Sequence, residues 1–143
     1  MPGFFEKEEQ QEKAQLLRKG LQKSDVRILE DAGCALGNGY YLLGRADACS
    51  EENGAPRADA KELLEKAPPE CYTIILDHQP TDYKNEAEAG ADLVLSGHTH
   101  GGQLFPLQLG MRLLHAGGVD FVYGMKTLRG TTFCVTSGLS SWG

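Results

Sequence analysis

Apolar and polar positions along the chain predict helices that alternate with short strands. Residues 6–23 are charged and helix-favouring and place Ala14, Leu17 and Leu21 on one face, which predicts a surface helix. Asp59 followed by Glu62 fits a capping box at the start of a second helix. The other apolar runs predict strands at 26–29, 34–36, 40–43, 71–76 and 92–95, and a short helix at 83–89.

Turn signals set the connections between these elements. Asn38-Gly39 stands between two apolar runs and is typical of a type I′ hairpin turn. Pro68-Pro69 stops the helix that begins at Asp59 at about Lys66. Beyond these, the sequence predicts a polar loop at 47–57, an irregular loop after Pro106, and a hairpin of 119–123 with 131–135 around a turn at 126–130.

The order of these elements predicts the fold class. The strands at 71–76 and 92–95, with the helix at 83–89 between them, form a β-loop-α-β unit, which places both strands side by side in one sheet. We therefore expect an α/β protein that has a mixed sheet with flanking helices. No linker of Pro, Gly and Ser divides the chain, so residues 1–143 are expected to form a single domain.

Composition and charge narrow the classes of function. A chain of 143 residues with 41% hydrophobic and 24% charged residues has globular composition. Its formal net charge is −6 and no basic stripe is present, which makes nucleic acid an unlikely partner and means that a phosphate ligand would need bound cations. The apolar runs are too short for a membrane span, and the four cysteines form no CxxC pair, so we expect reduced thiols and a cytoplasmic location. Tethering of the parent protein to a membrane through residues outside this chain stays open.

The candidate chemistry lies in the histidines of the second half. In an extended segment, residues i and i+2 point the same way, so His98 and His100 can present two imidazoles toward one point. His78 comes two residues after the end of the strand at 71–76, and the ends of parallel neighbouring strands meet at one edge of a sheet. One histidine after a strand is more often a packing residue, but this trio predicts a metal site for Zn²⁺, Mn²⁺, Fe or Ni²⁺. His115 is expected to lie outside it.

The segment 91–103 reads ADLVLSGHTHGGQ, and Pro106 follows three residues later. This segment resembles the GHTHGGQ-x-x-P signature of bacterial calcineurin-like metallophosphoesterases. Leu76-Asp77-His78-Gln79-Pro80 is similar to the H-x-P element of that family, and Tyr123-Gly124 with the segment 136–143 resembles its closing Y-G and S-G-x-x-x-W-G segments. The resemblance covers at least residues 72–143, and the G-x-x-D turn at 44–47 extends it.

The resemblance implies a fold, a cofactor and a set of site residues. The fold would be part of a four-layer α/β/β/α sandwich, of which this chain is the C-terminal portion. His78 and His98 would bind one of two divalent metal ions and His100 the other, while Gly101, Gly102 and Gln103 would line the substrate mouth. The implied activity is metal-assisted hydrolysis of a small phosphomonoester or phosphodiester. No catalytic proton donor is assigned.

This sequence lacks the D-x-H, G-D-x-x-D and G-N-H-D/E motifs that carry the family's remaining ligands. We therefore expect a partial metal site, poor activity of this chain alone, and self-association or domain swapping through an exposed face of the sheet. Two other classes remain open. One is a non-catalytic module in which the three histidines hold a single ion. The other is an amidohydrolase-like HxH enzyme, which would need a barrel that this chain is too short to build.

Overall fold

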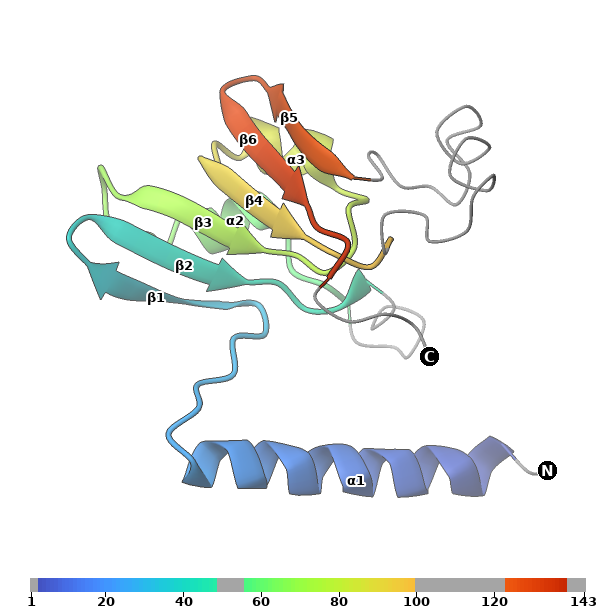
Figure 1. Cartoon of the computed structure of the whole chain (residues 1–143). Coiled ribbons are helices and arrows are strands. Elements are labelled where there is room, and N and C mark those ends of the chain that lie inside the picture. Colours follow the sequence, from blue (N-terminus) through green and yellow to red (C-terminus); the bar gives the residue numbers. More distant parts are fainter. Residues whose placement is uncertain (1–2, 49–55, 100–122, 139–143) are drawn as a thin grey trace, which may run out of the picture.

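The computed structural model describes residues 3–48, 56–99 and 123–138 (Figure 1). The chain begins with the long helix α1 and the hairpin of β1 and β2, and continues with two helices that alternate with strands and a second hairpin. The elements are α1 (Gly3–Lys23), β1 (Ala32–Gly37), β2 (Tyr40–Gly44), α2 (Ala60–Leu64), β3 (Tyr72–Leu76), α3 (Tyr83–Glu88), β4 (Leu93–Ser96), β5 (Gly124–Leu128) and β6 (Thr131–Val135).

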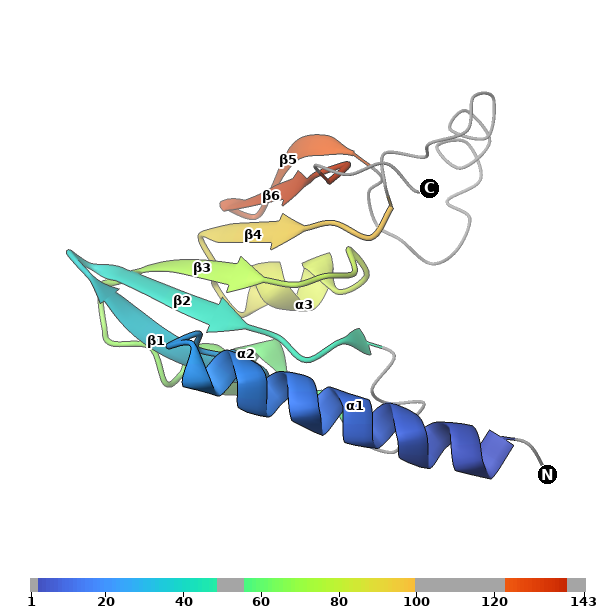
Figure 2. The same ribbon diagram turned by 60° about the horizontal axis from the view of Figure 1, so that its bottom comes forward.

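The described strands form one mixed sheet in the order β1-β2-β3-β4-β6-β5. The inner strands β2, β3, β4 and β6 are parallel to one another, and β1 and β5 pair antiparallel at the two edges. Parallel neighbours need crossover connections, and α2 and α3 supply them between β2 and β3 and between β3 and β4. Figure 2 shows both helices on the same side of the sheet, which confirms an α/β fold with a mixed sheet and flanking helices.

The hydrophobic core lies between the sheet and these two helices. Alternate residues of the strands point to this side, because successive side chains of a strand face opposite ways. Phe133 stacks on Tyr83 of α3 with ring centroids 4.0 Å apart and is fully buried. The other buried core residues are Tyr41, Leu43, Leu63, Ile75, Ala87, Ala91, Val94 and Val135.

The opposite face of the sheet is apolar and open. Leu76 and Leu95 are neighbours on β3 and β4, and they are 39% and 36% exposed. Met125 of β5 is 72% exposed. We call the face that carries these three residues the open face. α1 does not cover it with its own apolar stripe, since Leu17 remains 64% exposed and Figure 1 shows α1 set apart from the sheet.

One predicted turn and one predicted helix cap are confirmed. Asn38 and Gly39 have φ of 51° and 79°, as a type I′ turn requires. Asp59 caps α2, and its side chain accepts a hydrogen bond from the main-chain N–H of Lys61 at 2.8 Å. The helix ends at Leu64 rather than at Lys66.

The strand predicted at residues 26–29 is wrong. This segment has no strand pairing, and residues with left-handed φ stand near both of its ends, Asp25 at 54° and Asp31 at 47°. Leu29 instead packs against the main chain of Gly44, where a Cβ would lie 2.5 Å from the Leu29 Cβ. Only Leu29 of this segment is partly buried, whereas Val26 and Ile28 are exposed, so the alternating pattern does not mark a buried face. The first strand begins only at Ala32.

The second hairpin is displaced from its predicted position. Its first strand is β5 (Gly124–Leu128) rather than residues 119–123, of which 119–122 lie outside the described residues. The turn is the pair Arg129-Gly130, with φ of 51° and 91°, and not the longer segment 126–130. Arginine is an uncommon first residue of a two-residue turn with positive φ. The residue types at the turn therefore did not reveal its position, and the first strand was predicted too early in the sequence. The prediction of one domain over residues 1–143 stays a prediction.

Candidate functional site

The carboxyl ends of the four parallel strands meet at one edge of the sheet. Their hydrogen-bond ladders continue past the last strand residues. Arg45 N donates to Leu76 O at 3.0 Å, Asp77 N to Leu95 O at 3.0 Å, and Thr136 N to Ser96 O at 2.9 Å. The loops that follow β2, β3, β4 and β6 therefore leave the sheet together, and ligand sites of open α/β sheets lie at such edges.

His78 and His98 converge at this edge. His78 Nε2 lies 3.3 Å from His98 Nδ1, and the two rings meet edge to face with centroids 5.1 Å apart. Gly97 N donates to His78 O at 3.1 Å, so a main-chain bond fixes the spacing of the two loops. Both imidazoles are exposed and accessible to a ligand from solvent.

The bend that brings His98 to His78 lies in the histidine itself. His98 has a φ of 63°, in the left-handed region that non-glycine residues seldom occupy. Thr99 N donates to Gly97 O at 2.7 Å across this bend. A Cβ on Gly97 would meet only His78 Nδ1, at an ordinary 3.9 Å, so local space does not require glycine there. The strain is therefore carried by a candidate ligand, which is common at functional sites.

The separation of the two nitrogens fits a shared metal ion. Two imidazoles that bind one tetrahedral ion at about 2.0–2.1 Å place their nitrogens roughly 3.3 Å apart. The same distance fits a hydrogen bond between one protonated and one unprotonated nitrogen, which is the interaction the pair makes on its own. Within residues 3–48, 56–99 and 123–138, no group of three His, Cys, Asp or Glu side chains is arranged to hold a metal. The described residues thus contain two of the three candidate ligands.

The other residues expected at the site lie outside the described residues. These are the third candidate ligand, His100, the expected substrate-lining residues Gly101, Gly102 and Gln103, and also His115. Their roles stay predictions.

A buried charged cluster beneath the histidines was not foreseen from the sequence. It contains Arg45, Arg57, Asp77, Asp82 and Glu86, which we call the charged cluster. Arg45 Nη1 lies 2.5 Å from Asp82 Oδ2, 3.3 Å from Glu86 Oε1 and 3.6 Å from Asp77 Oδ2. Arg57 forms an ion pair with Asp77. The only sequence signal was the unusual placement of Asp77 between an apolar strand and His78.

Glu86 is the most perturbed acid of this cluster. Burial, and then the charge of Asp77 and a hydrogen bond with it, raise the pKa of Glu86 to about 8. Arg45 acts in the opposite direction but is shared among three carboxyl groups. Asp77 Oδ1 and Glu86 Oε2 are both buried without a hydrogen-bond partner when both groups are charged. A proton retained on Glu86 therefore satisfies two atoms that would otherwise be unpaired.

A second contact ties the His78 loop to the segment after β2. Gln79 is buried and donates from Nε2 to Asp47 Oδ2 at 2.8 Å. Its Oε1 accepts from the main-chain N–H of Ala48 at 3.1 Å. Asp47 is the last residue of the G-x-x-D turn, so this turn contacts the residue next to His78.

Apolar surface adjoins the histidines on the open face. A hollow of about 560 Å³ is lined by His78 and by apolar side chains that include Leu42, Leu76 and Leu95.

Elsewhere in the described chain, Cys34, Cys71 and Cys134 are free thiols. Among the described residues, no helix combines the length and the apolarity that crossing a bilayer requires.

Comparison with known proteins finds several similar chains. A metallophosphoesterase of Helicobacter pylori is 35% identical over 125 residues, which are 86% of this chain and 32% of the relative. A metallophosphoesterase of Campylobacter jejuni is 33% identical over 129 residues, 90% of this chain and 32% of the relative. A transmembrane protein with a metallophosphoesterase domain from Bos taurus is 41% identical over 81 residues, 55% of this chain and 17% of the relative.

The chain spans about a third of the length of these bacterial relatives. No family model and no solved structure matches it.

Proposed function

Because this chain belongs to the calcineurin-like metallophosphoesterase family, whose members are metal-dependent phosphoester hydrolases, we propose that it supplies histidine ligands to a dinuclear divalent-metal centre. The reaction proposed for the whole protein is hydrolysis of a small phosphomonoester or phosphodiester. The observation that supports this proposal most directly is the approach of His78 Nε2 to His98 Nδ1, at 3.3 Å, at the edge where the parallel strands end.

The proposed roles of the residues follow from their positions. His78 and His98 bind one ion, and His100 binds the second. Gly101, Gly102 and Gln103 line the substrate mouth, where glycines let the main chain approach a phosphate closely. When bound, divalent ions of this kind polarise a phosphoryl group and activate water near neutral pH. The ions would be Mn, Zn, Fe or Ni, which all accept imidazole ligands.

The charge of the chain supports a role for metal ions in binding substrate. Its formal net charge is −6, and the two buried arginines beside Asp77, Arg45 and Arg57, are already paired with carboxylates. A phosphate group therefore finds no free buried cation in the described part of the site. Bound divalent ions would supply the positive charge.

Metal binding by the 143-residue chain is the first test. Titration with Zn²⁺ or Co²⁺ is expected to show binding that His78→Ala and His98→Ala each weaken at least tenfold. His115→Ala is the matched control, because we expect that histidine to lie outside the site. Equal affinity of the chain and of both site variants would remove these histidines from the metal centre.

Turnover is the second test. This chain alone is expected to hydrolyse para-nitrophenyl phosphate and bis-para-nitrophenyl phosphate poorly, because histidines provide no bridging carboxylate to hold two ions about 3.5 to 4 Å apart. A fusion with the unaligned part of the Helicobacter pylori relative is expected to hydrolyse at least one of them with Mn²⁺ or Zn²⁺. In that fusion, His98→Ala should abolish turnover. Robust turnover by this chain alone would show that it needs no further ligands.

A non-catalytic module that holds one ion is the alternative function. It is favoured by the absence, among the described residues, of any carboxylate grouped with His78 and His98. The two proposals differ in stoichiometry, since the module binds one ion per chain both alone and in the fusion. Free thiols at three described cysteines support a cytoplasmic location for either function.

A further inference from the structure

Two carboxylates flank His78 in sequence, and one guanidinium contacts both of them. The loop between β3 and α3 begins at Asp77, carries His78 as its second residue and ends at Asp82, the residue before α3. Arg45 Nη1 lies 2.5 Å from Asp82 Oδ2 and 3.6 Å from Asp77 Oδ2. One side chain from the end of β2 therefore connects the two ends of the loop that carries the candidate ligand.

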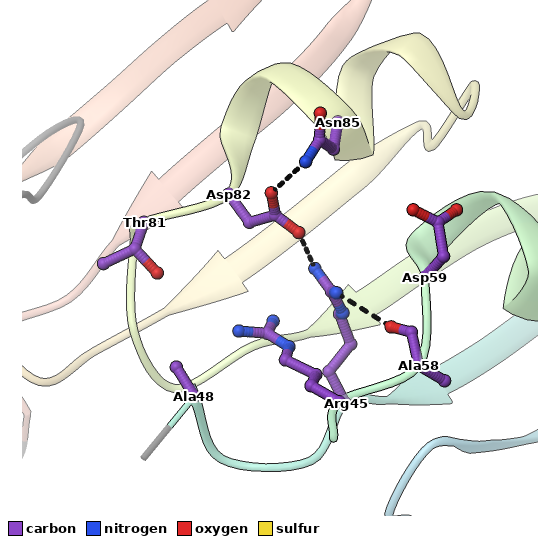
Figure 3. Close-up of a pocket in the computed structure, with 8 residues that line it drawn as sticks. Arg45, Ala48, Ala58, Asp59, Thr81, Asp82 and Asn85 are labelled. Carbon is purple, nitrogen blue, oxygen red and sulfur yellow. Dashed lines mark hydrogen bonds and ion pairs between the residues drawn. The ribbon is translucent and has the colours of Figure 1, made fainter. Parts of the chain in front are cut away.

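Arg45 is held rigidly enough to serve as such a connection. Its side chain is only 3% exposed. Its main-chain N–H extends the ladder between β2 and β3, and its Nη2 donates to the carbonyl of Ala58 at 3.1 Å. Figure 3 shows the guanidinium between this carbonyl and the carboxylate of Asp82, which in turn accepts from Asn85 of α3 at 2.6 Å.

Other contacts hold the rest of the His78 loop from both of its neighbouring strands, β2 and β4. Gln79 is tied to the turn that contains Asp47 and Ala48. Arg57, from the segment that leads into α2, pairs with Asp77. The main-chain bond from Gly97 to His78 O fixes one point of the loop against the neighbouring loop. That bond sets the position of the main chain at His78, while the side-chain contacts set the path of the chain around it.

We infer that Arg45 is a positioning residue for His78: its contacts with Asp77 and Asp82 fix the loop conformation that brings the His78 ring to the His98 ring. The inference rests on the proposed function only in treating this histidine pair as a metal site. Arg45 does not contact either ring. It acts through the two carboxylates that flank the histidine, and partners of this kind tune metal affinity by fixing how a ligand is oriented.

The geometry requires arginine rather than a cation in general. The guanidinium uses Nη1 for the carboxylates and Nη2 for the carbonyl of Ala58, which lie in different directions. Lysine offers a compact charge at one point and cannot span these partners. Arg45→Lys therefore keeps the charge but loses part of the connection. Because lysine still places a positive charge beside the acids of the cluster, Arg45→Lys is the substitution of Arg45 that we expect to disturb folding least.

The test uses the full chain and two readouts. The first needs no metal: two-dimensional ¹H–¹⁵N spectra of the imidazoles report the environment of the His78 and His98 rings. We expect Arg45→Lys to shift or broaden the ring signals of His78. The second is the affinity for Co²⁺ followed by its visible absorption, which we expect Arg45→Lys to weaken about tenfold, the lower end of the range for residues that orient a ligand. Arg129→Lys is the control, since Arg129 pairs with Glu88 at the exposed edge.

Each outcome decides the inference. A folded Arg45→Lys chain with unchanged ring signals and Co²⁺ affinity overturns it. If the parent chain binds no Co²⁺, the proposed function fails, and the ring spectra alone decide whether Arg45 positions His78. If Arg45→Lys does not fold, Asp82→Asn releases one end of the loop at a side chain that is 24% exposed, and the same two readouts apply to it. Equal changes in Arg129→Lys would identify a general loss of stability and refute a specific role of Arg45.

Discussion

Replacing Glu86 by glutamine tests whether this buried acid is neutral in the folded protein. The pKa of Glu86 is about 8 in the folded chain and about 4.5 as an ordinary value, because burial and the neighbouring Asp77 disfavour its charge. Between these two values the folded state holds one proton more than the unfolded state. The contribution of this proton on Glu86 to stability is therefore complete below pH 4.5 and is lost as the pH rises through 8.

The size of this effect follows from the linkage between protons and folding. The free energy of unfolding should fall by about 1.4 kcal/mol for each pH unit between the two pKa values. From pH 5 to pH 8 the loss accumulates to roughly 3 to 4 kcal/mol, a large part of the about 5 to 15 kcal/mol that stabilises a typical domain. Glutamine is a neutral analogue of the protonated acid, so Glu86→Gln should lack this term.

The assay is urea unfolding followed by circular dichroism at half-unit steps from pH 5 to pH 9, on the parent chain and on Glu86→Gln. Subtracting the two curves removes the titration of all other groups. The parent should lose stability relative to the variant up to about pH 8 and then level off. Glu88→Gln is the control on the same helix. Its carboxylate pairs with Arg129 at the exposed surface, so the difference should stay within about 0.5 kcal/mol at every pH.

A flat difference between the parent and Glu86→Gln would refute the reasoning. A difference that rises with pH would refute it more strongly, because it would mean that Arg45 stabilises a charged Glu86. The stabilising term would then be present above pH 4.5 and lost as the pH falls.

Two further predictions concern the site and the open face. In urea titrations, the free energy of unfolding should be about 1 kcal/mol higher for His98→Gly than for His98→Ala, because glycine adopts a φ of 63° without strain and alanine does not. Equal free energies of unfolding would show that the bend relaxes without cost. The open face should bind a second copy of this chain, since Leu76, Leu95 and Met125 remain exposed on it. Light scattering over a concentration series should show a mass that rises with concentration for the parent and not for Leu95→Lys, whereas a monomeric parent would mean that this face is covered within the chain.

Local signals in the sequence predicted the elements whose conformation is decided locally. Asn38-Gly39 adopts the predicted turn because both residues tolerate positive φ, and Asp59 caps α2 because its side chain reaches the main chain two residues later. The convergence of His78 and His98 was predictable for another reason: each histidine comes two residues after an apolar strand, and the β-loop-α-β order makes the two strands parallel neighbours. For the turn and the cap, the neighbouring residues in the sequence suffice to determine the geometry.

Features that depend on distant residues were not predictable in the same way. Arg45 contacts acids 37 and 41 residues further along the chain, and no short motif contains both partners. The segment 26–29 alternates like a strand, yet it pairs with no strand, and its Leu29 packs against Gly44 instead. In this segment the alternation does not even mark a buried face, since Val26 and Ile28 are exposed. It does not record whether a neighbouring strand is available to pair with the main chain.

The balance of charge in the cluster explains why so many ionisable groups can lie beneath the site. Two guanidinium groups face three carboxyl groups, and burying a charge without a partner costs several kcal/mol. A proton on Glu86 leaves Arg45 and Arg57 against Asp77 and Asp82, which are equal in number and paired by contact. The raised pKa of Glu86 therefore removes one negative charge from a cluster that has one more acid than base. The hydrogen bonds and ion pairs of Arg45 run to both ends of the His78 loop. A proton on Glu86 of α3 therefore stabilises the loop conformation that positions His78, although Glu86 belongs to no recognisable motif.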